Sequence, residues 1–386
     1  MQHENKSHRD PFGPEDVLRV YDAALGMTGF LVIDNTALGP GKGGIRMTSG
    51  ITEEEVFRLA RTMTWKNALA GIPFGGAKAG IVWPGGSDEE KKTYIQSFAR
   101  ALKPFLPKKY IAGPDVNTGE REMQWFVEAA GNWRAATGKP ANYCMAVFGK
   151  EGEKCGIPHE FGSTGFGIAH STAVAAELCG INVKGAKVAI HGFGNVGTFA
   201  YQFLTEMGAV IVALADRGGA VFSEEGFDKA AIENLIAKPR CCLADIFPDK
   251  KIKAEDFWGV SADILIPASV TDVINDSNKA SIRAKLIVEA GNIPMREHIE
   301  EELFKKGIMF VPDFVANAGG VISSYAEYRG YNPKRMFEMV KTKITRSTKS
   351  VITKSIREKR SPRAVGMELA VVKVQKAMSE RATTFR

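Results

Sequence analysis

The chain has 386 residues, of which 44% are hydrophobic and 25% charged, so it is long enough for two domains of roughly 150–200 residues each. It lacks any run of about 18 apolar residues, and its first residues lack the basic and then apolar profile of a signal peptide. These features predict a cytoplasmic protein with no membrane partner.

The formal net charge of +7 is compatible with nucleic-acid binding, because a clustered basic surface is the usual footprint of that function. Much of the excess lies between Lys334 and Arg363, where glutamates are interspersed in a sequence of helical composition. We interpret this stretch as the solvated face of a helix and expect no nucleic-acid partner.

Residue types that bind metals or form disulfides are scattered along the chain. The cysteines form no C-x-x-C pair and lie at Cys144, Cys155, Cys179, Cys241 and Cys242. The histidines lie at His3, His8, His159, His170, His191 and His298. We therefore expect reduced cysteines in packing positions and no metal site.

The first half of the chain mixes short strand-like runs with helix-like segments. Strands are expected at residues 30–33, 79–82 and 110–112. A helix is expected from about Glu53 to Leu69, because the capping pattern Thr52-x-x-Glu55 opens it.

Three lysines of this half lie in glycine-rich sequence: Lys42 in GPGKGGIRM, Lys66 in MTWKNALAG and Lys78 in PFGGAKAGI. Glycine removes side-chain bulk, so we expect glycine-rich loops on which a small substrate lies against backbone and ammonium together. Asp115 follows in IAGPDVNTG, where Pro114 and the residues after it predict a loop end at the lip of a cleft.

The clustering of three ammonium groups has a chemical consequence. Mutual repulsion and desolvation both lower the pKa of a lysine toward neutrality, so one lysine can act as a general base while Asp115 moves protons. On residue types alone the alternative stays open that the lysines face solvent and that Asp115 caps a turn.

The second half alternates apolar strands with segments of helical length. Strands are expected at residues 187–191, 210–215, 264–267, 286–289 and 309–311. This rhythm predicts a doubly wound parallel sheet that is buried on both faces. The sequence from about Asn332 onward is helical in composition and contains no further predicted strand.

A G-x-G-x-x-G pattern follows the first of these strands directly and precedes a helix-like stretch. Its residues are Gly192, Phe193, Gly194, Asn195, Val196 and Gly197. Gly192 allows the tight turn, Gly194 lets the backbone approach a pyrophosphate, and Gly197 allows close packing of helix on strand. The free N–H groups of the helix N-terminus attract the phosphates, so the pattern predicts a dinucleotide site.

The identity of the dinucleotide depends on two neighbouring residues. Asp216 ends the second strand, nineteen residues beyond Gly197, where an acidic residue bonds the adenosine ribose of NAD. Arg217 follows it and suits the extra phosphate of NADP. The expected cofactor is therefore NAD or NADP, and the sequence leaves the choice open.

From about residue 20 to residue 330 the sequence resembles the glutamate/leucine/phenylalanine/valine dehydrogenase superfamily. MTWKNALAGIPFGGAKAGI is similar to its catalytic signature, and PDVNT is similar to its aspartate motif. The resemblance implies that Lys78 is the catalytic lysine, that Asp115 transfers protons, and that Lys66 holds the α-carboxylate of the substrate. In the nucleotide half it implies that Thr164 contacts the nicotinamide amide and that Asn292 and Asn317 line the nicotinamide and substrate pocket.

Substrate choice in the superfamily depends on few positions. Its glutamate enzymes carry a lysine before a glycine pair and a serine seven residues after the asparagine of NAGG, and Lys42 and Ser324 match both. The resemblance implies that these two residues bind the side-chain carboxylate in a pocket that Gly43 and Val321 line. Gly113 departs from the pattern, because alanine is common there, and this changes the pocket by about one methyl group.

The expected activity is the oxidative deamination of L-glutamate to 2-oxoglutarate and ammonia, and its reverse, with NAD or NADP. The alternative is a dehydrogenase of aliphatic or aromatic amino acids. The resemblance also implies an α/β substrate and oligomerisation domain (1–160), a Rossmann-type domain (161–335) and C-terminal helices (336–386) that return to the first domain. A homohexamer is the implied assembly.

Overall fold

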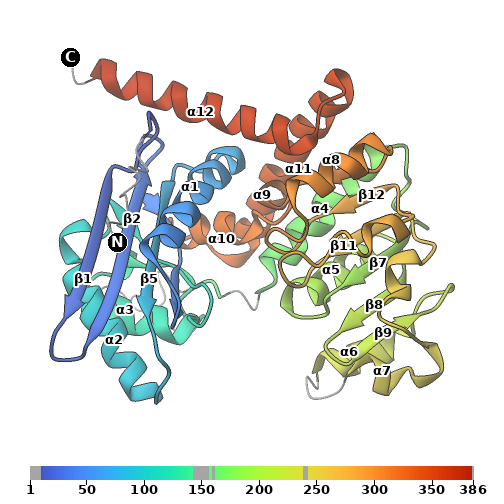
Figure 1. Cartoon of the computed structure of the whole chain (residues 1–386), viewed down its shortest axis with the longest axis horizontal. Coiled ribbons are helices and arrows are strands. Elements are labelled where there is room, and N and C mark those ends of the chain that lie inside the picture. Colours follow the sequence, from blue (N-terminus) through green and yellow to red (C-terminus); the bar gives the residue numbers. More distant parts are fainter. Residues whose placement is uncertain (1–9, 142–155, 159–160, 238–241, 385–386) are drawn as a thin grey trace, which may run out of the picture. The chain divides into compact units, whose positions relative to one another are not determined.

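The computed structural model describes residues 10–141, 156–158, 161–237 and 242–384, which form two compact units (Figure 1). The first unit comprises residues 1–161, 321–339 and 369–386, and the second comprises 162–320 and 340–368. Six residues considered above lie outside the described part of the chain: Cys144, Cys155, Cys241, His3, His8 and His159.

The first unit is built on a six-stranded sheet in the order β1-β2-β5-β3-β6, with β4 paired to β5. Its strands are β1 (Asp16–Asp22), β2 (Met27–Asn35), β3 (Gly41–Lys42), β4 (Ile45–Thr48), β5 (Gly75–Val82) and β6 (Tyr110–Ile111). Its helices include α1 (Glu53–Ala70), α2 (Asp88–Ala101) and α3 (Glu120–Ala130). All three strands predicted in this half are confirmed, and β1, β3 and β4 were not predicted.

Alternation along β2 distributes its side chains to the two faces of this sheet. Phe30 and Val32 pack with residues of α1, whereas Leu31 and Ile33 pack with residues of α2 and α3. The sheet therefore lies between α1 on one face and α2 and α3 on the other, and its central strands are buried on both sides.

The helix α1 begins and ends where its sequence indicates. The hydroxyl of Thr52 accepts a hydrogen bond from the N–H of Glu55 at 3.2 Å, which is the N-cap that the sequence predicted. The helix ends at Gly71, which takes the left-handed conformation (φ 64°) that terminates many helices.

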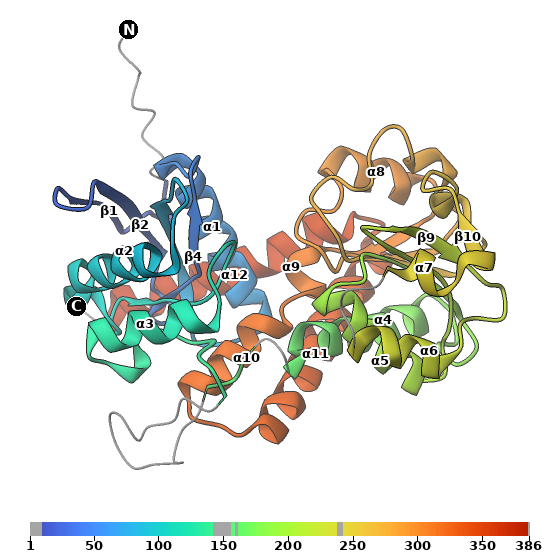
Figure 2. The same ribbon diagram turned by 90° about the horizontal axis from the view of Figure 1, so that it is seen from below.

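The second unit is built on a seven-stranded sheet in the order β10-β9-β8-β7-β11-β12-β13. Its strands are β7 (Lys187–His191), β8 (Val210–Asp216), β9 (Gly219–Phe222), β10 (Lys251–Ile252), β11 (Ile264–Pro267), β12 (Leu286–Val288) and β13 (Met309–Val311). The helices that flank it include α4 (Ser163–Leu178), α5 (Asn195–Glu206), α6 (Lys229–Ala237), α7 (Leu243–Ile246) and α8 (Glu297–Lys305). Figure 2 shows α4, α5 and α6 on one face of this sheet and α8 on the other.

The five strands predicted in this half all pair in parallel, which confirms the doubly wound arrangement. Two further strands, β9 and β10, extend one edge in antiparallel pairing and were not predicted. Both are short, and β9 begins with glycine, so neither gives an apolar run that sequence periodicity detects.

The chain ends in α9 (Asp313–Ala316), α10 (Gly319–Tyr328), α11 (Pro333–Glu358) and α12 (Pro362–Thr384). The last part of α12 belongs to the first unit, where the ammonium of Lys373 donates to the carbonyls of Ala68 and Leu69 at 3.2 Å. The last carbonyls of a helix lack intrahelical partners, so the ammonium of Lys373 supplies hydrogen bonds and a favourable charge at the C-terminus of α1. Of the C-terminal stretch predicted to return to the first domain, residues 336–339 and 369–386 belong to the first unit, whereas 340–368 belong to the second, and 321–335 lie in the first unit although they were predicted in the Rossmann-type domain. Within the described residues, no helix combines the length and apolarity that a membrane crossing needs.

Arg363, at the start of α12, is the centre of a buried ionic cluster in the second unit. It donates to Glu300 at 2.8 Å, to Glu289 at 3.1 Å and to Asp313 at 3.0 Å. Burial and the neighbouring carboxylates raise the pKa of Glu289 well above its usual value, and Arg363 opposes this increase.

We expect Arg363→Met to lower the free energy of unfolding by about 3–5 kcal/mol, because it leaves buried carboxylates without their cation. The exposed Arg357→Met variant is the control and should change it by less than about 0.5 kcal/mol. Denaturant titration of the full-length protein measures both, and equal effects would contradict the prediction.

Candidate functional site

The structure places the three predicted lysines on regular elements. Lys42 ends the strand β3, Lys66 lies in the helix α1, and Lys78 lies in the middle of β5. Lys66 thus lies on the helix expected from Glu53 to Leu69, whereas the interpretation of Lys42 and Lys78 as residues of glycine-rich loops is wrong. The glycines serve a different purpose, because they let neighbouring backbone segments approach the lysine strands.

Gly43 and Gly44 bring the segment between β3 and β4 against the catalytic candidates. A side-chain carbon on Gly43 would lie 1.6 Å from the carbonyl oxygen of Ala77 and 3.2 Å from the Cα of Lys78. One on Gly44 would lie 2.8 Å from the Cβ of Asp115. Any larger residue at Gly43 or Gly44 would push this segment away from the backbone that carries Lys78 and Asp115.

Lys78 and Asp115 form a direct ion pair. The ammonium of Lys78 bonds one carboxylate oxygen of Asp115, and Arg46 donates to the other at 2.8 Å. Arg46 also donates to Glu55 at 2.8 Å, so the four side chains form one network. Asp115 itself lies in a turn closed by Thr118, as its sequence predicted. Arg46 was missed by sequence reasoning, although it lies in the same GGIRM stretch as Gly44.

Burial and charge set the protonation states of this pair. Burial lowers the pKa of Lys78, and Asp115 opposes that decrease. Burial alone would raise the pKa of Asp115, but Lys78 and Arg46 outweigh it and lower the pKa to about 2. Asp115 is therefore an anion at neutral pH. The predicted fall in lysine pKa is confirmed, with burial as its largest cause.

Lys42 is buried, and its ammonium donates to the carbonyl of Ala112 at 2.8 Å. It occupies space that Gly113 leaves open, because a side-chain carbon on Gly113 would lie 2.4 Å from the Lys42 Nζ and 3.7 Å from the Oγ1 of Thr137. The hydroxyl of Thr137 is buried and has no hydrogen-bond partner among the described residues. The surroundings of Lys42 therefore offer an ammonium and an unused hydroxyl.

Two further buried charges of the first unit were missed by sequence reasoning. Lys139 and Glu327 form an ion pair with 2.5 Å between nitrogen and oxygen. Glu327 lies on α10, three residues after the predicted site residue Ser324 and six after Val321, so the three share one helix face. Ser324 and Val321 are half-buried, as is Lys66 on α1.

The phosphate-binding candidate of the second unit has the geometry that its sequence predicted. Gly192 takes φ +104°, and a side-chain carbon there would lie 2.7 Å from the carbonyl of Ala268. Gly197 lets α5 pack closely against the turn: a side-chain carbon added to Gly197 would lie 1.9 Å from the carbonyl oxygen of Gly192. Gly194 is open by comparison. A side-chain carbon on Gly194 would have no described atom within 4 Å apart from its chain neighbours and its own helix backbone, which leaves room for a pyrophosphate.

The first turn of α5 is open to a ligand. Asn195 is exposed, Phe193 and Val196 are half-buried, and these residues surround the N-terminus of the helix. Because the first N–H groups of a helix lack intrahelical partners, they can bond phosphate oxygens here. The residues present thus fit a dinucleotide.

The predicted nicotinamide-side residues come together in the second unit. The amide of Asn317 donates to the carbonyl of Gly291 at 3.1 Å and to the side-chain oxygen of Asn292 at 3.0 Å. A side-chain carbon on Gly319 would lie 3.0 Å from the Cα of Thr164, so the start of α4 lies against the same segment. Asn292 and Asn317 therefore lie together beyond the carboxyl ends of β12 and β13, and the segment that follows Asn317 lies against the start of α4, which carries Thr164.

His191 and Ser269 join the two strands at which the sheet reverses its order, and sequence reasoning missed them. The His191 Nδ1 and the Ser269 hydroxyl are 2.8 Å apart, and the imidazole stacks on Trp258 with 4.7 Å between ring centroids. Burial lowers the pKa of His191 to about 4, so its ring is neutral. The pair fixes the β7 and β11 ends at the switch point, where doubly wound sheets bind ligands.

Asp216 is held by the backbone at the end of β8. One carboxylate oxygen accepts the N–H of Gly218 at 2.7 Å, and the other accepts the N–H of Leu243 at 2.8 Å. Arg217 is exposed beside it. The carboxylate is thus fixed in place, whereas the guanidinium is not packed against the sheet.

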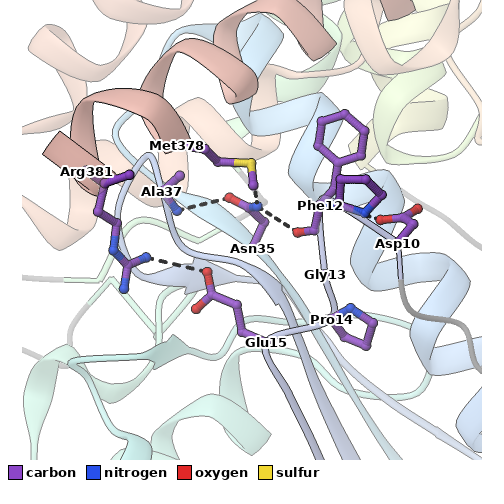
Figure 3. Close-up of a pocket in the computed structure, with 11 residues that line it drawn as sticks. Asp10, Phe12, Gly13, Pro14, Glu15, Asn35, Ala37, Met378 and Arg381 are labelled. Carbon is purple, nitrogen blue, oxygen red and sulfur yellow. Dashed lines mark hydrogen bonds and ion pairs between the residues drawn. The ribbon is translucent and has the colours of Figure 1, made fainter.

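A cavity of about 410 Å³ lies between the N-terminal segment and α12 in the first unit (Figure 3). Its polar groups bind one another: Asn35 donates to the carbonyl of Phe12 at 2.7 Å, and Arg381 donates to Glu15 at 3.5 Å. The residues that line it include none of the predicted site residues. We interpret it as the seam where the two ends of the chain meet. In the described ranges, no three His, Cys, Asp or Glu side chains gather as a metal site would require.

Comparison with known proteins places these features in context. Residues 155–382 match the family model described as glutamate/leucine/phenylalanine/valine dehydrogenase, and residues 14–132 match the model of that family's dimerisation domain.

Curated relatives and solved structures agree with these matches. The chain is 36% identical over 364 residues to a glutamate dehydrogenase of Aeropyrum pernix, covering 90% of the chain and 85% of the relative. It is 37% identical over 360 residues to an NADP-specific glutamate dehydrogenase of Saccharolobus shibatae, covering 90% and 83%. The hetero-hexameric glutamate dehydrogenase of Thermus thermophilus superposes with a TM-score of 0.79 at 26% identity, covering 95% of this chain and 90% of that one.

Proposed function

Because the chain belongs to the glutamate/leucine/phenylalanine/valine dehydrogenase family, we propose that it oxidatively deaminates L-glutamate to 2-oxoglutarate and ammonia with NAD or NADP, and catalyses the reverse reaction. The observation that carries the choice of glutamate is the buried ammonium of Lys42. An apolar side chain would leave that ammonium without an anion, which is costly in a buried pocket.

A count of the charges around Lys42 supports a dicarboxylate. Lys42 and Lys139 are both buried, and Glu327 is the buried carboxylate that affects the pKa of each. With both lysines protonated, the three groups have a net charge of +1. The side-chain carboxylate of glutamate neutralises this surplus, and Ser324, on the face of α10 that carries Glu327, donates a further hydrogen bond to it.

The chemistry uses the Lys78–Asp115 pair. NAD or NADP, held by the second unit, would supply the acceptor for the hydride of the substrate Cα. Lys66 binds the α-carboxylate and orients the substrate. Lys78, once it has lost its proton, activates a water molecule that attacks the resulting iminium carbon, and Asp115 passes protons to the departing ammonia. Loss of the Lys78 proton removes the nearest cation from Asp115, so the two residues exchange one proton as a unit.

The second unit holds the cofactor. The turn from Gly192 to Gly194 and the first N–H groups of α5 bind the pyrophosphate, and Asp216 binds the adenosine ribose. Thr164, Asn292 and Asn317 contact the nicotinamide side.

We expect a preference for NAD over NADP. The fixed carboxylate of Asp216 bonds free ribose hydroxyls and repels a 2′-phosphate, and its two backbone bonds prevent it from turning away. Asp216→Ser should shift the ratio of kcat/KM for NAD to that for NADP by about tenfold or more toward NADP. Arg217→Ala is the control and should leave NAD use unchanged. A wild-type preference for NADP would contradict the prediction.

The proposed activity is tested by following formation of reduced nicotinamide with a panel of L-amino acids. Glutamate should give the highest kcat/KM, and leucine, valine and phenylalanine should give values lower by at least about 10²-fold, as expected when a buried charge lacks its partner. Highest activity with an apolar amino acid would instead favour a dehydrogenase of aliphatic or aromatic substrates.

A homohexamer in the cytoplasm completes the proposal. Support for self-association comes from the match of residues 14–132 to a dimerisation domain and from the similarity to a hetero-hexameric enzyme. Light scattering of the purified protein measures the assembly directly.

A further inference from the structure

One ion pair of the first unit is fully buried and takes no part in the proposed hydride and proton transfers. The side chains of Lys139 and Glu327 are 1% and 0% exposed. Glu327 also accepts hydrogen bonds from the N–H groups of Gly138 at 2.7 Å and Ile157 at 3.0 Å. Because desolvation offsets most of the attraction within such a pair, burial of these charges is weak evidence for a role in stability alone.

A short series of contacts joins this pair to Lys42. The carbonyl oxygen of Ala112 accepts the ammonium of Lys42 at 2.8 Å and the N–H of Thr137 at 3.1 Å. The next N–H along the chain, that of Gly138, donates to Glu327. Two consecutive residues therefore hold both groups: Thr137 bonds the carbonyl that anchors Lys42, and Gly138 bonds the carboxylate of Glu327.

We propose that Glu327 and Lys139 form a positioning pair that fixes the place and the charge of the Lys42 ammonium, and so determines how well the site binds a dicarboxylate at a given pH. This inference rests on the proposed function and deepens it. Both residues act through Lys42, and neither is assigned a contact with the substrate.

The two members of the pair act on Lys42 in opposite directions. Burial lowers the pKa of Lys42 to about 7; Glu327 opposes this decrease, whereas Lys78 and Lys139 add to it. A dicarboxylate binds the protonated form, so its affinity falls as the pH rises through that pKa. Removing the charge of Glu327 lowers the pKa of Lys42 further, and removing the charge of Lys139 raises it. A pair with only a structural role would instead weaken binding in the same way whichever member is lost.

Titration of glutarate into the full-length protein over a series of pH values tests this. Glutarate has two carboxylates and no amino group, so the measurement needs no turnover. In the wild type we expect the affinity to fall about tenfold per pH unit above a midpoint near the pKa of Lys42. Glu327→Gln should move the midpoint down by about one pH unit, Lys139→Met should move it up by a similar amount, and the double variant should return it toward wild type.

A matched ion pair in the same unit supplies the control. Lys91 and Glu122 are 3.0 Å apart, and Glu122 also accepts a backbone N–H, that of Gly119, at 2.7 Å. Neither contributes to the pKa of Lys42. Lys91→Met and Glu122→Gln should leave the midpoint unchanged, and so should Lys139→Arg, which keeps the charge.

The outcomes separate the two proposals. Midpoints that stay in place, or that move in the same direction in both single variants, would overturn the positioning role. If Glu327→Gln does not fold, Lys139→Met decides alone, because a downward shift or no shift contradicts the inference. A wild-type protein that binds no glutarate at any pH would instead refute the proposed preference for glutamate.

Discussion

Replacing Lys78 with alanine is expected to lower kcat for glutamate oxidation by roughly 10³–10⁴-fold, with NADH affinity unchanged. Lys78 is buried in β5, and burial lowers its pKa toward the range in which an amine can lose its proton and act as a base. Asp115→Asn should reduce kcat to a similar extent, because the ion pair exchanges one proton. Steady-state kinetics measure kcat, and NADH fluorescence titration measures cofactor binding.

The control for this prediction is another partly buried lysine of the same unit. Lys91→Ala removes an ammonium that pairs with Glu122, so it tests for a general loss of structure. It should leave kcat within about twofold of the wild type. Near-normal turnover in Lys78→Ala would remove Lys78 from the mechanism, and equal losses in Lys91→Ala would point to a structural effect.

The parts of the fold that the sequence predicted are those set by local patterns. The five parallel strands of the second sheet are apolar runs of ordinary length, and the cap at Thr52 needs only its neighbours. The glycines of the phosphate turn were interpreted correctly, because the G-x-G-x-x-G pattern lies within six residues, although the backbone that Gly192 approaches belongs to the distant Ala268.

The buried charges could not be predicted in the same way, because their partners are far apart in sequence. Arg363 meets Glu289 across 74 residues, and Lys139 meets Glu327 across nearly the whole second unit. In sequence, each of these residues has the character of an ordinary surface charge. Only the folded chain shows that Lys139 pairs with Glu327 and that the charge of this carboxylate also acts on Lys42.

The error over Lys42 and Lys78 has a physical cause. Glycine weakens a strand, so glycine-rich sequence favours a loop when it is judged by propensity. In β3 and β5 the glycines are tolerated because neighbouring segments fill the space where side chains would be: a side-chain carbon on Gly76 of β5 would lie 2.0 Å from the Oγ1 of Thr64. Close packing here outweighs local preference, which is common where a backbone must approach a ligand.

Replacing the two polar residues proposed to bind the side-chain carboxylate should produce the second large effect, a change of preferred substrate. In Lys42→Leu/Ser324→Val, the remaining charges of Lys139 and Glu327 balance, so the pocket becomes neutral and apolar. We expect kcat/KM for glutamate to fall by roughly 10²–10⁴-fold, because a buried carboxylate loses its cation. Norvaline and leucine should become the preferred substrates, since their side chains need no counter-charge.

Comparison of the single variants shows which residue carries this selectivity. Lys42→Leu alone should account for most of the loss with glutamate, because an ionic partner contributes more than a hydroxyl. Ser324→Val alone should lower kcat/KM for glutamate by about tenfold. Initial rates with glutamate, norvaline and leucine give all three ratios. A double variant that still prefers glutamate would show that the side-chain carboxylate binds elsewhere, and the charge count around Lys42 would then need another explanation.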